Sequence, residues 1–457
     1  MDNLNVVNDD LVIARKYLLN GEYEQGIRYC KNIKKKFGNN TDFWIVLGDL
    51  YNNNDQYKKA IKSYEIAYLL SPNKSIILIR LTVPYMKIGN YNKTGIYWAR
   101  AVSLGEGSEE IGQRFADITN NPKCEPWAML EICKIFENFL KKSEKNKRKM
   151  LKFIGTIKKL IVYKIIQYIE KDSNLTQFVK YTNILENLGI RKVLKEIENM
   201  KKNIYGKKPK NSEDQYLFMN LSFSEKNKFS PERLKNLLMI GTIMFKKQNF
   251  EDAYYYCVEA IEVADILKDS KNKLAILKIK AKLLNILGGR DISNGYYYDA
   301  YIKYDEALKL SLELQIQESV ATSLKNLGVI SLIKREYDQA LEKCNKALEI
   351  VEKSPNPSNK AIYINTIGKI YYELGNYNKA LEKFQNANEI AKSQNNQLAI
   401  ALSLHNIGKL FYKQGDNIRA LDLLNDALHI LNEHYLESSY AIQIFKKKIE
   451  TLKSKMI

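Results

Sequence analysis

The sequence predicts an all-α protein built as a solenoid of repeated helix pairs. The first observation is a series of glycines at steps of 40 residues: Gly288, Gly328, Gly368 and Gly408. Alanines keep the same step, at Ala300, Ala340, Ala380 and Ala420. The second observation is the composition, with 45% hydrophobic and 27% charged residues but only 8 prolines and 21 glycines. This composition fits a folded chain of long helices and leaves little material for the turns of an all-β protein.

A second repeat, of 34 residues, precedes the first one. The chain of 457 residues is long for one compact core, and a repeat array avoids this limit because each unit packs only against its neighbours. From Trp44 the sequence places small and large residues at fixed offsets: Trp44, Leu47, Gly48, Tyr51, Ala60, Tyr64, Ala67 and Pro72. Gly48 and Ala60 are small where two helices are expected to cross. The tyrosines and the tryptophan are expected to fill the adjoining gaps.

This pattern resembles the tetratricopeptide repeat, over residues 8 to about 105 and 232–433. The 40-residue copies, with Asn326-Leu327-Gly328 and Asn406-Ile407-Gly408, are similar to repeats of kinesin light chains and of Rap/PlcR-type peptide-sensing regulators. The resemblance implies an α-α superhelix with a concave groove that holds peptides or helices. It does not imply a particular partner.

We therefore expect two arrays joined by a basic helical segment. Residues 1–118 form an N-terminal array of about three 34-residue repeats, and residues 119–229 form the connector. Within the connector, 125–139, 151–170 and 181–203 have helical apolar spacing, whereas 201–214 reads as a linker. Residues 230–457 form a C-terminal array of about five repeats. It begins with Ser230 as an N-cap before Pro231 and ends with a solvent-facing capping helix over 440–452.

The positive charge is concentrated in the connector. The chain has a net charge of +20, and residues 121–230 hold 24 Lys and Arg against 12 Asp and Glu. The densest part, residues 141–164, includes Lys141, Lys142, Lys152, Lys158 and Lys159. We interpret this part first as a solvated helix face. Binding of an acidic protein comes next, and binding of nucleic acid or an anionic membrane surface is less favoured.

No arrangement of residues indicates catalysis, a metal or a cofactor. Of the three histidines, His429 and His434 are five residues apart, which does not place them on one helical face. The five cysteines are scattered, and Cys30, Cys257 and Cys344 occupy a packing offset of the repeat. We expect a protein that is not an enzyme. The absence of an apolar run of 18 residues and of a signal-peptide pattern leads us to expect a cytoplasmic location.

Candidate ligand contacts lie on the first helix of each pair, which lines the groove in the family that the repeats resemble. In the C-terminal array the candidates are Asn285, Lys325, Asn326, Asn365, Lys369, Tyr372, His405, Asn406, Lys409 and Tyr412. Asn amides both donate and accept hydrogen bonds, so a ladder of them can read an extended peptide backbone. Lys369 and Lys409 would add a preference for acidic peptides or a terminal carboxylate. Asn285 and Asn365 stand one position earlier in their repeats than Asn326 and Asn406.

The N-terminal array has a different groove. The positions where chaperone-binding arrays carry a Lys and Asn carboxylate clamp hold Val12, Arg15, Ile45, Asp49 and Ile79. This set does not match the clamp, and its Ile and Val residues indicate a more apolar groove that suits an amphipathic helix.

We predict a non-enzymatic scaffold or adaptor that binds peptide or helical segments of other proteins in its groove. One alternative is a regulator whose C-terminal array changes shape on binding a signalling peptide. Another is a nucleic-acid or membrane-surface binder acting through residues 141–164. The sequence leaves the partner and the oligomeric state open.

Overall fold

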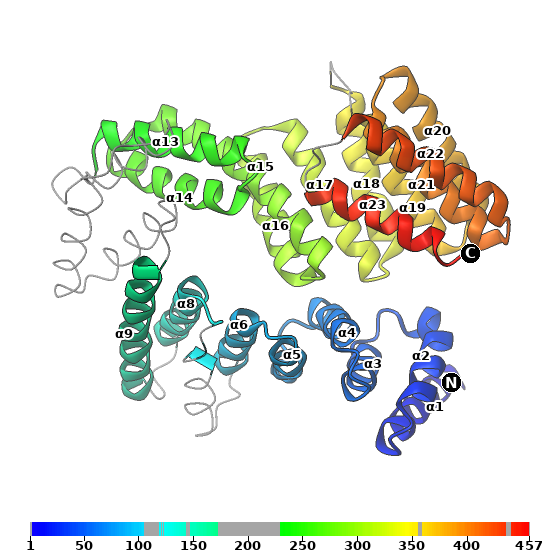
Figure 1. The fold of residues 1–457 in the computed structure, drawn as a ribbon, viewed down its shortest axis with the longest axis horizontal. Coiled ribbons are helices and arrows are strands. Elements are labelled where there is room, and N and C mark those ends of the chain that lie inside the picture. The colour runs from blue at the N-terminus through cyan, green and yellow to red at the C-terminus, as the bar shows by residue number, and fades with distance from the viewer. Residues whose placement is uncertain are drawn as a thin grey trace. The chain divides into compact units, whose positions relative to one another are not determined.

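The structure is a computed structural model that describes residues 2–104, 118, 119, 121, 123–142, 147–171, 229–354, 359–435 and 440–456. Within these residues the secondary-structure elements are α-helices joined by short turns. The chain divides into two compact units, Met1–Ile240 and Gly241–Ile457, which run from blue to green and from green to red in Figure 1. This agrees with the predicted all-α superhelix of helix pairs. The division falls inside one helix, slightly after residue 230, where we expected the second array to begin.

The N-terminal unit is a series of helices in which each packs against the next along the chain. The helices are α1 (Asp2–Leu19), α2 (Tyr23–Phe37), α3 (Thr41–Asn53), α4 (Tyr57–Leu70), α5 (Ser75–Lys87), α6 (Tyr91–Ser103), α8 (Pro126–Lys142) and α9 (Lys147–Lys171). The turn inside each of the first three pairs contains one residue with positive φ: Gly21, Asp55 and Gly89. A left-handed residue at this place ends the first helix and reverses the chain.

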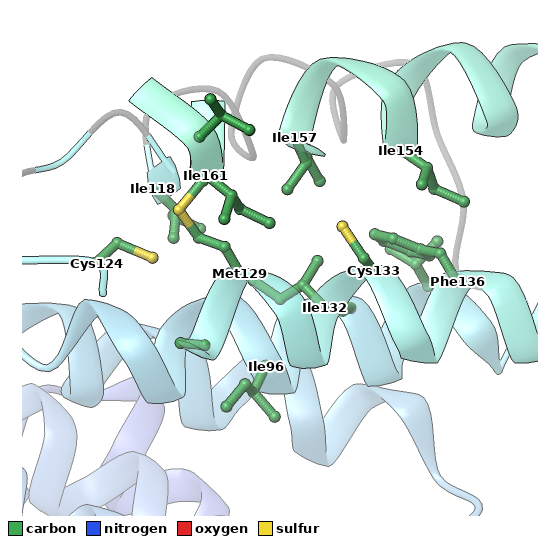
Figure 2. Close-up of a cluster of buried hydrophobic side chains, with 14 of the residues drawn as sticks. Ile96, Ile118, Cys124, Met129, Ile132, Cys133, Phe136, Ile154, Ile157 and Ile161 are labelled. Atoms are coloured by element: carbon green, nitrogen blue, oxygen red, sulfur yellow. The ribbon is translucent and has the colours of Figure 1, made fainter. Parts of the chain in front are cut away.

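Helices α8 and α9 continue the core of the N-terminal array. Figure 2 shows Ile154, Ile157 and Ile161 of α9 facing the side chains of α8, which in turn lie against Ile96 of α6. Gly95 on α6 permits this close approach, because a Cβ at this position would lie 2.8 Å from Cδ1 of Ile132. Residues 126–171, which we expected to be a connector, therefore share one hydrophobic core with the last pair of the array.

A buried lysine fixes the chain before α8. Lys164 of α9 is 8% exposed, and its Nζ donates hydrogen bonds to the carbonyl oxygens of Asn121 (2.7 Å) and Cys124 (2.8 Å). Burial lowers the pKa of this lysine. The predicted helix at 181–203 and the predicted linker at 201–214 lie outside the described residues.

The second series of helices begins where the sequence predicts it. The Ser230 Oγ accepts a hydrogen bond from the backbone N–H of Arg233 (3.2 Å), so Ser230 is an N-cap and Pro231 is the first helical residue. The helices are α13 (Pro231–Lys246), α14 (Phe250–Ile266), α15 (Ser270–Asn294), α16 (Tyr297–Glu313), α17 (Gln317–Ile333), α18 (Tyr337–Glu352), α19 (Lys360–Leu374), α20 (Tyr377–Ser393), α21 (Gln397–Gln414), α22 (Asn417–His434) and α23 (Tyr440–Lys453).

The regularly spaced glycines lie at the crossing of the two helices in each pair. A Cβ on Gly368 would lie 2.6 Å from Cε1 of Phe384, and one on Gly288 would lie 2.5 Å from Cε1 of Tyr304. Cys344 fills the same place opposite Gly328. The second helix can therefore approach closely only because the first carries no side chain at this point. The cysteine is a packing residue, and burial raises its pKa to about 12.

Candidate ligand-binding groove

The first helices of the C-terminal unit lie on the inner side of the array. Successive first helices contact one another, α15 with α17, α17 with α19, and α19 with α21, whereas successive second helices are not in comparable contact. Elements that converge in this way are on the inside of a curved stack. The predicted candidates on α15, α17, α19 and α21 therefore lie along one face, and their side chains fall into two groups.

The four asparagines form the first group, and they are hydrogen-bonded within the array. On α15, Asn285 donates to the Ser323 Oγ of α17 (2.8 Å) and accepts from the Asn326 Nδ2 of the same helix (2.9 Å). A second donor bond of Asn285 reaches the carbonyl oxygen of Ala281 (3.2 Å). The side chain of Asn285 is 8% exposed, so its donors and its acceptor are used inside the protein.

The same arrangement recurs one double repeat later. Asn365 of α19 donates to the Ser403 Oγ of α21 (2.8 Å) and accepts from the Asn406 Nδ2 (3.1 Å). Asn365 is fully buried and Asn406 is 4% exposed. The shift of one position between Asn365 and Asn406 is what brings the two amides together across adjacent first helices. Three of the four predicted amides are thus buried and engaged, and only Asn326 is half-buried.

The second group, which consists of lysines with aromatic residues and a histidine, faces the open side of the inner surface. Lys325 of α17 lies over the ring of Tyr363 on α19, with its Nζ 5.5 Å from the ring centroid. Lys409 of α21 lies over the ring of Tyr372 at 4.1 Å, and its Nζ is 3.5 Å from the Glu373 Oε1. Such contacts hold the lysine stems against the protein and leave the charged ends at its surface.

Lys369 and His405 occupy the centre of this surface. Lys369 is open to solvent, yet the surrounding walls remove it from bulk water, which lowers its pKa to about 8 with a further contribution from Lys409 and Lys448. Burial, followed by Lys369 and Lys409, lowers the pKa of His405 to about 4. Its imidazole is therefore neutral near pH 7. Tyr412 is half-buried on the same helix.

The last helix forms one wall of this site, which the sequence did not reveal. Helix α23 packs its apolar side on α21 and α22, with Ile449 fully buried, as expected of a capping helix. It also contacts α15, so it is not simply a solvent-facing cap. The Phe445 ring meets His405 edge to face with centroids 5.3 Å apart. The run Lys446–Lys448 on an amphipathic helix was the signal that could have indicated a wall of the site.

A cavity of about 490 Å³ lies between α19, α21 and α23. Four of the ten predicted residues line it: Lys369, His405, Asn406 and Lys409. The other predicted residues are not brought to this cavity. The remaining lining residues are Leu402, Phe445, Lys447, Lys448, Thr451, Leu452 and Lys455.

In the two other predicted binding surfaces, several charged side chains already have partners within the protein. In the basic segment 141–164, Lys158 pairs with Glu137 (2.8 Å) and Lys164 is buried under the chain before α8. The side chains of Lys141, Lys142 and Lys152 lie outside the described residues. In the N-terminal groove, Asp49 accepts from the Tyr64 hydroxyl (2.7 Å) and pairs with Arg80 (2.9 Å). Val12 is 42% exposed and remains on the surface.

The described residues also bear on metal binding and on membrane spanning. Among these residues, no group of three or more His, Cys, Asp or Glu side chains is placed to hold a metal ion. None of the described helices combines the length and the apolar character needed to cross a membrane.

Comparison with known proteins identifies the repeats. The family described as Tetratricopeptide repeat matches residues 319–393 and 360–433, and no curated protein sequence matches the chain. Among solved structures, BtubC (BKLC) from P. vanneervenii is 22% identical and covers 45% of this chain and 84% of its own, with a TM-score of 0.34. Yeast Tom70 is 12% identical, covering 100% and 96%, with a TM-score of 0.32.

The apo form of RapI is 15% identical and covers 59% of this chain and 95% of its own, with a TM-score of 0.34. Structural similarities with such low TM-scores and sequence identities carry no information about the ligand of this chain. The family match falls on α17 to α22, where the glycine crossings also repeat. Residues 319–433 of this chain are therefore tetratricopeptide repeats.

Proposed function

We propose that the C-terminal array is a non-enzymatic protein-binding module that holds an acidic segment of a partner on its inner face. Tetratricopeptide repeats support interaction with other proteins in general. The observation that carries the finer proposal is the row of Lys325, Lys369 and Lys409 on three successive first helices, beside the buried ring of Tyr363 and the half-buried ring of Tyr372. Within the described residues, Glu373 is the one acidic side chain paired with this row.

The lysines, and not the asparagines, carry recognition in this proposal. The amides of Asn285, Asn365 and Asn406 already hold adjacent first helices together, so a ligand would have to break those bonds to use them. The lysine ammonium groups can bind an acidic ligand without breaking these hydrogen bonds between the first helices. Each exposed ion pair contributes only about 0.2–1 kcal/mol, so binding needs several pairs along the segment together with contacts to the half-buried ring of Tyr372.

Site-specific photo-crosslinking from position 372 tests the proposal. A photoreactive phenylalanine analogue replaces Tyr372, and bound proteins are identified by mass spectrometry. We expect crosslinks to acidic segments that are lost in Lys369→Glu/Lys409→Glu. The matched control is Lys346→Glu/Lys392→Glu, which makes the same charge change at exposed positions on the second helices α18 and α20. Equal crosslinking in both double variants, or crosslinks to basic segments, contradicts the proposal.

A regulator that changes shape on binding a peptide is a second candidate, favoured by one observation. Helix α23 is both the last helix of the array and a wall of the cavity, so a ligand in the groove would contact this helix, and a displacement of α23 would change the shape of the unit. Small-angle X-ray scattering with and without an acidic peptide tests it. An unchanged profile at saturation removes this candidate and leaves the binding module.

A further inference from the structure

The charged side chains that line the cavity between α19, α21 and α23 are all positive. Five lysines line it: Lys369 on α19, Lys409 on α21, Lys447 and Lys448 on α23, and Lys455 in the turn after α23. No acidic side chain is among its lining residues, and Glu373 of α19 is paired with Lys409 at 3.5 Å. In a folded protein, like charges collected in a concave site repel one another and concentrate oppositely charged solutes there.

Removal from bulk water and the crowding of positive charge together lower the pKa of two groups that line the cavity, Lys369 and His405. Lys409 and Lys448 add to the removal from bulk water in lowering the pKa of Lys369 to about 8. The same cations help to lower the pKa of His405 to about 4. The His405 Nδ1 is buried and has no hydrogen-bond partner. An anion in the cavity would relieve the repulsion and could supply a partner for this nitrogen when the imidazole carries its proton there.

We propose that α19, α21, α23 and the turn after α23 form a pocket for a multiply charged anionic group, and that α23 with this turn supplies three of its five lysines. The pocket deepens the proposed function, because it would hold the acidic group of a bound segment. Its chemistry is that of clustered carboxylates or of phosphate, since lysine ammonium groups act as compact point charges toward either one.

The apolar part of the cavity distinguishes the ligand from a bare ion. Leu402, Phe445 and Leu452 line the same space, and the Phe445 ring is held edge-on against His405. An inorganic anion would leave these side chains uncovered, whereas an acidic peptide with an apolar residue beside its carboxylates would cover them. The acidic peptide is therefore the source that the geometry favours.

Nuclear magnetic resonance of the histidines gives a direct test with the full chain. The protein has only three histidines, and His429 and His434 serve as internal controls, since neither lines the cavity. The probes are pyrophosphate and the peptide acetyl-Glu-Leu-Asp-Asp-Leu-Glu. We expect saturable shifts of the His405 resonances with at least one probe, a rise in its pKa, and no comparable change at His429 or His434.

A charge reversal on α23 tests the contribution of that helix. Lys448→Glu places an anion in the pocket, and we expect it to weaken binding of the probe roughly ten- to hundredfold. Lys453→Glu is the matched control on the same helix, because Lys453 does not line the cavity. It should change binding less than about threefold. Circular dichroism shows whether each variant keeps its helices.

The outcomes distinguish a peptide from a phosphate as the source of the anion. They also test the pocket separately from the protein-binding function. Tighter binding of the peptide supports an acidic segment, and equal binding of pyrophosphate supports a small phosphorylated molecule in the same pocket. The pocket is overturned if neither probe shifts His405, or if Lys448→Glu and Lys453→Glu weaken binding equally. Crosslinking at position 372 without any effect at His405 leaves the protein-binding function standing and removes the pocket. An effect at His405 without crosslinking at position 372 removes the protein-binding function and leaves the pocket standing.

Discussion

Asn406 donates from its Nδ2 to the Oδ1 of Asn365 across 3.1 Å, and the two residues lie on adjacent first helices, α21 and α19. The Asn365 amide then donates to the Ser403 Oγ on α21. The three side chains close a buried network with donors and acceptors matched. The network of Asn285, Ser323 and Asn326 joins α15 to α17 in the same way, so the inner face is tied together at every second repeat.

Asn365→Ala should destabilise the C-terminal unit by roughly 2–3 kcal/mol. The change leaves the Asn406 amide and the Ser403 hydroxyl buried with a partner missing, and an unsatisfied buried polar group costs about 1–3 kcal/mol. The measurement is urea unfolding followed by circular dichroism. Asn386→Ala is the control, because Asn386 is exposed on α20 and should change stability by less than about 0.5 kcal/mol. Equal midpoints for the two variants would show that the network contributes nothing.

Gly368→Ala should destabilise the unit by roughly 1–2 kcal/mol, although alanine favours helices. The new Cβ would lie 2.6 Å from Cε1 of Phe384, so the helices must move apart. Phe384→Leu should relieve part of this cost, because Leu424 stands opposite Gly408 with atoms 3.2–3.3 Å from the Cβ position. A double-mutant cycle measures the coupling, and strict additivity of the two changes would contradict the packing argument.

Gly155→Ala provides the opposite case for the same substitution. Gly155 lies within α9 and is exposed, and no neighbouring atom lies within 4 Å of a Cβ placed on it. We expect this change to stabilise the N-terminal unit by up to about 1 kcal/mol, since glycine is a poor helix former. Thermal unfolding checks the sign. A loss of stability would mean that the space around the new Cβ does not explain why alanine is tolerated differently at Gly155 and Gly368.

The fold could be predicted from the sequence because its signals are local and repeated. Gly368 and Phe384 are separated by one helix and one turn, and the same pair of positions recurs in each copy. The N-cap at Ser230 depends on residues next to it in the chain. Short-range patterns of this kind are fixed by the periodicity of the helix and by the turn.

The site was less predictable because it depends on contacts between distant segments. From the sequence, the shift of one position between Asn365 and Asn406 weakened the case for a ligand-binding ladder. In the structure the stagger of α19 against α21 turns this shift into a hydrogen bond. The place of α23 was equally hidden, because an amphipathic pattern gives the apolar side of a helix but not the surface that it covers. Phe445 and Lys448 were therefore missed.

Arg335→Gly should stabilise the C-terminal unit by about 1 kcal/mol. Arg335 ends its helix with φ 62°, whereas the matching turns one repeat on either side and two repeats later use Gly295, Gly375 and Gly415. A residue with a Cβ is strained in this conformation, while glycine is not. Gly375→Ala is the reciprocal change and should destabilise by a similar amount. If thermal unfolding moved in the same direction for both variants, turn strain would not be the cause.

His405 should make the C-terminal unit sensitive to acid. Its pKa is lowered to about 4 in the folded protein, against about 6.5 in an unfolded chain. Between these values the unfolded chain binds the extra proton, so stability falls as the pH decreases from about 6.5 to 4. Burial is the main cause, and the facing cations are Lys369 on α19, Lys409 on α21 and Lys448 on α23.

The size of this loss is up to about 3 kcal/mol, if the whole difference in pKa acts on folding. His405→Gln keeps a polar side chain but does not titrate, so it should lose less stability than the wild type between pH 7 and pH 4. Urea unfolding at several pH values gives the difference between the two proteins, in which the titration of other groups cancels. His429→Gln is the control, because His429 is exposed and near Glu433 at 3.4 Å. Parallel pH profiles for the wild type and His405→Gln would mean that the imidazole is not held neutral by its surroundings. The lysines around the cavity would then be more fully screened by water than their arrangement indicates.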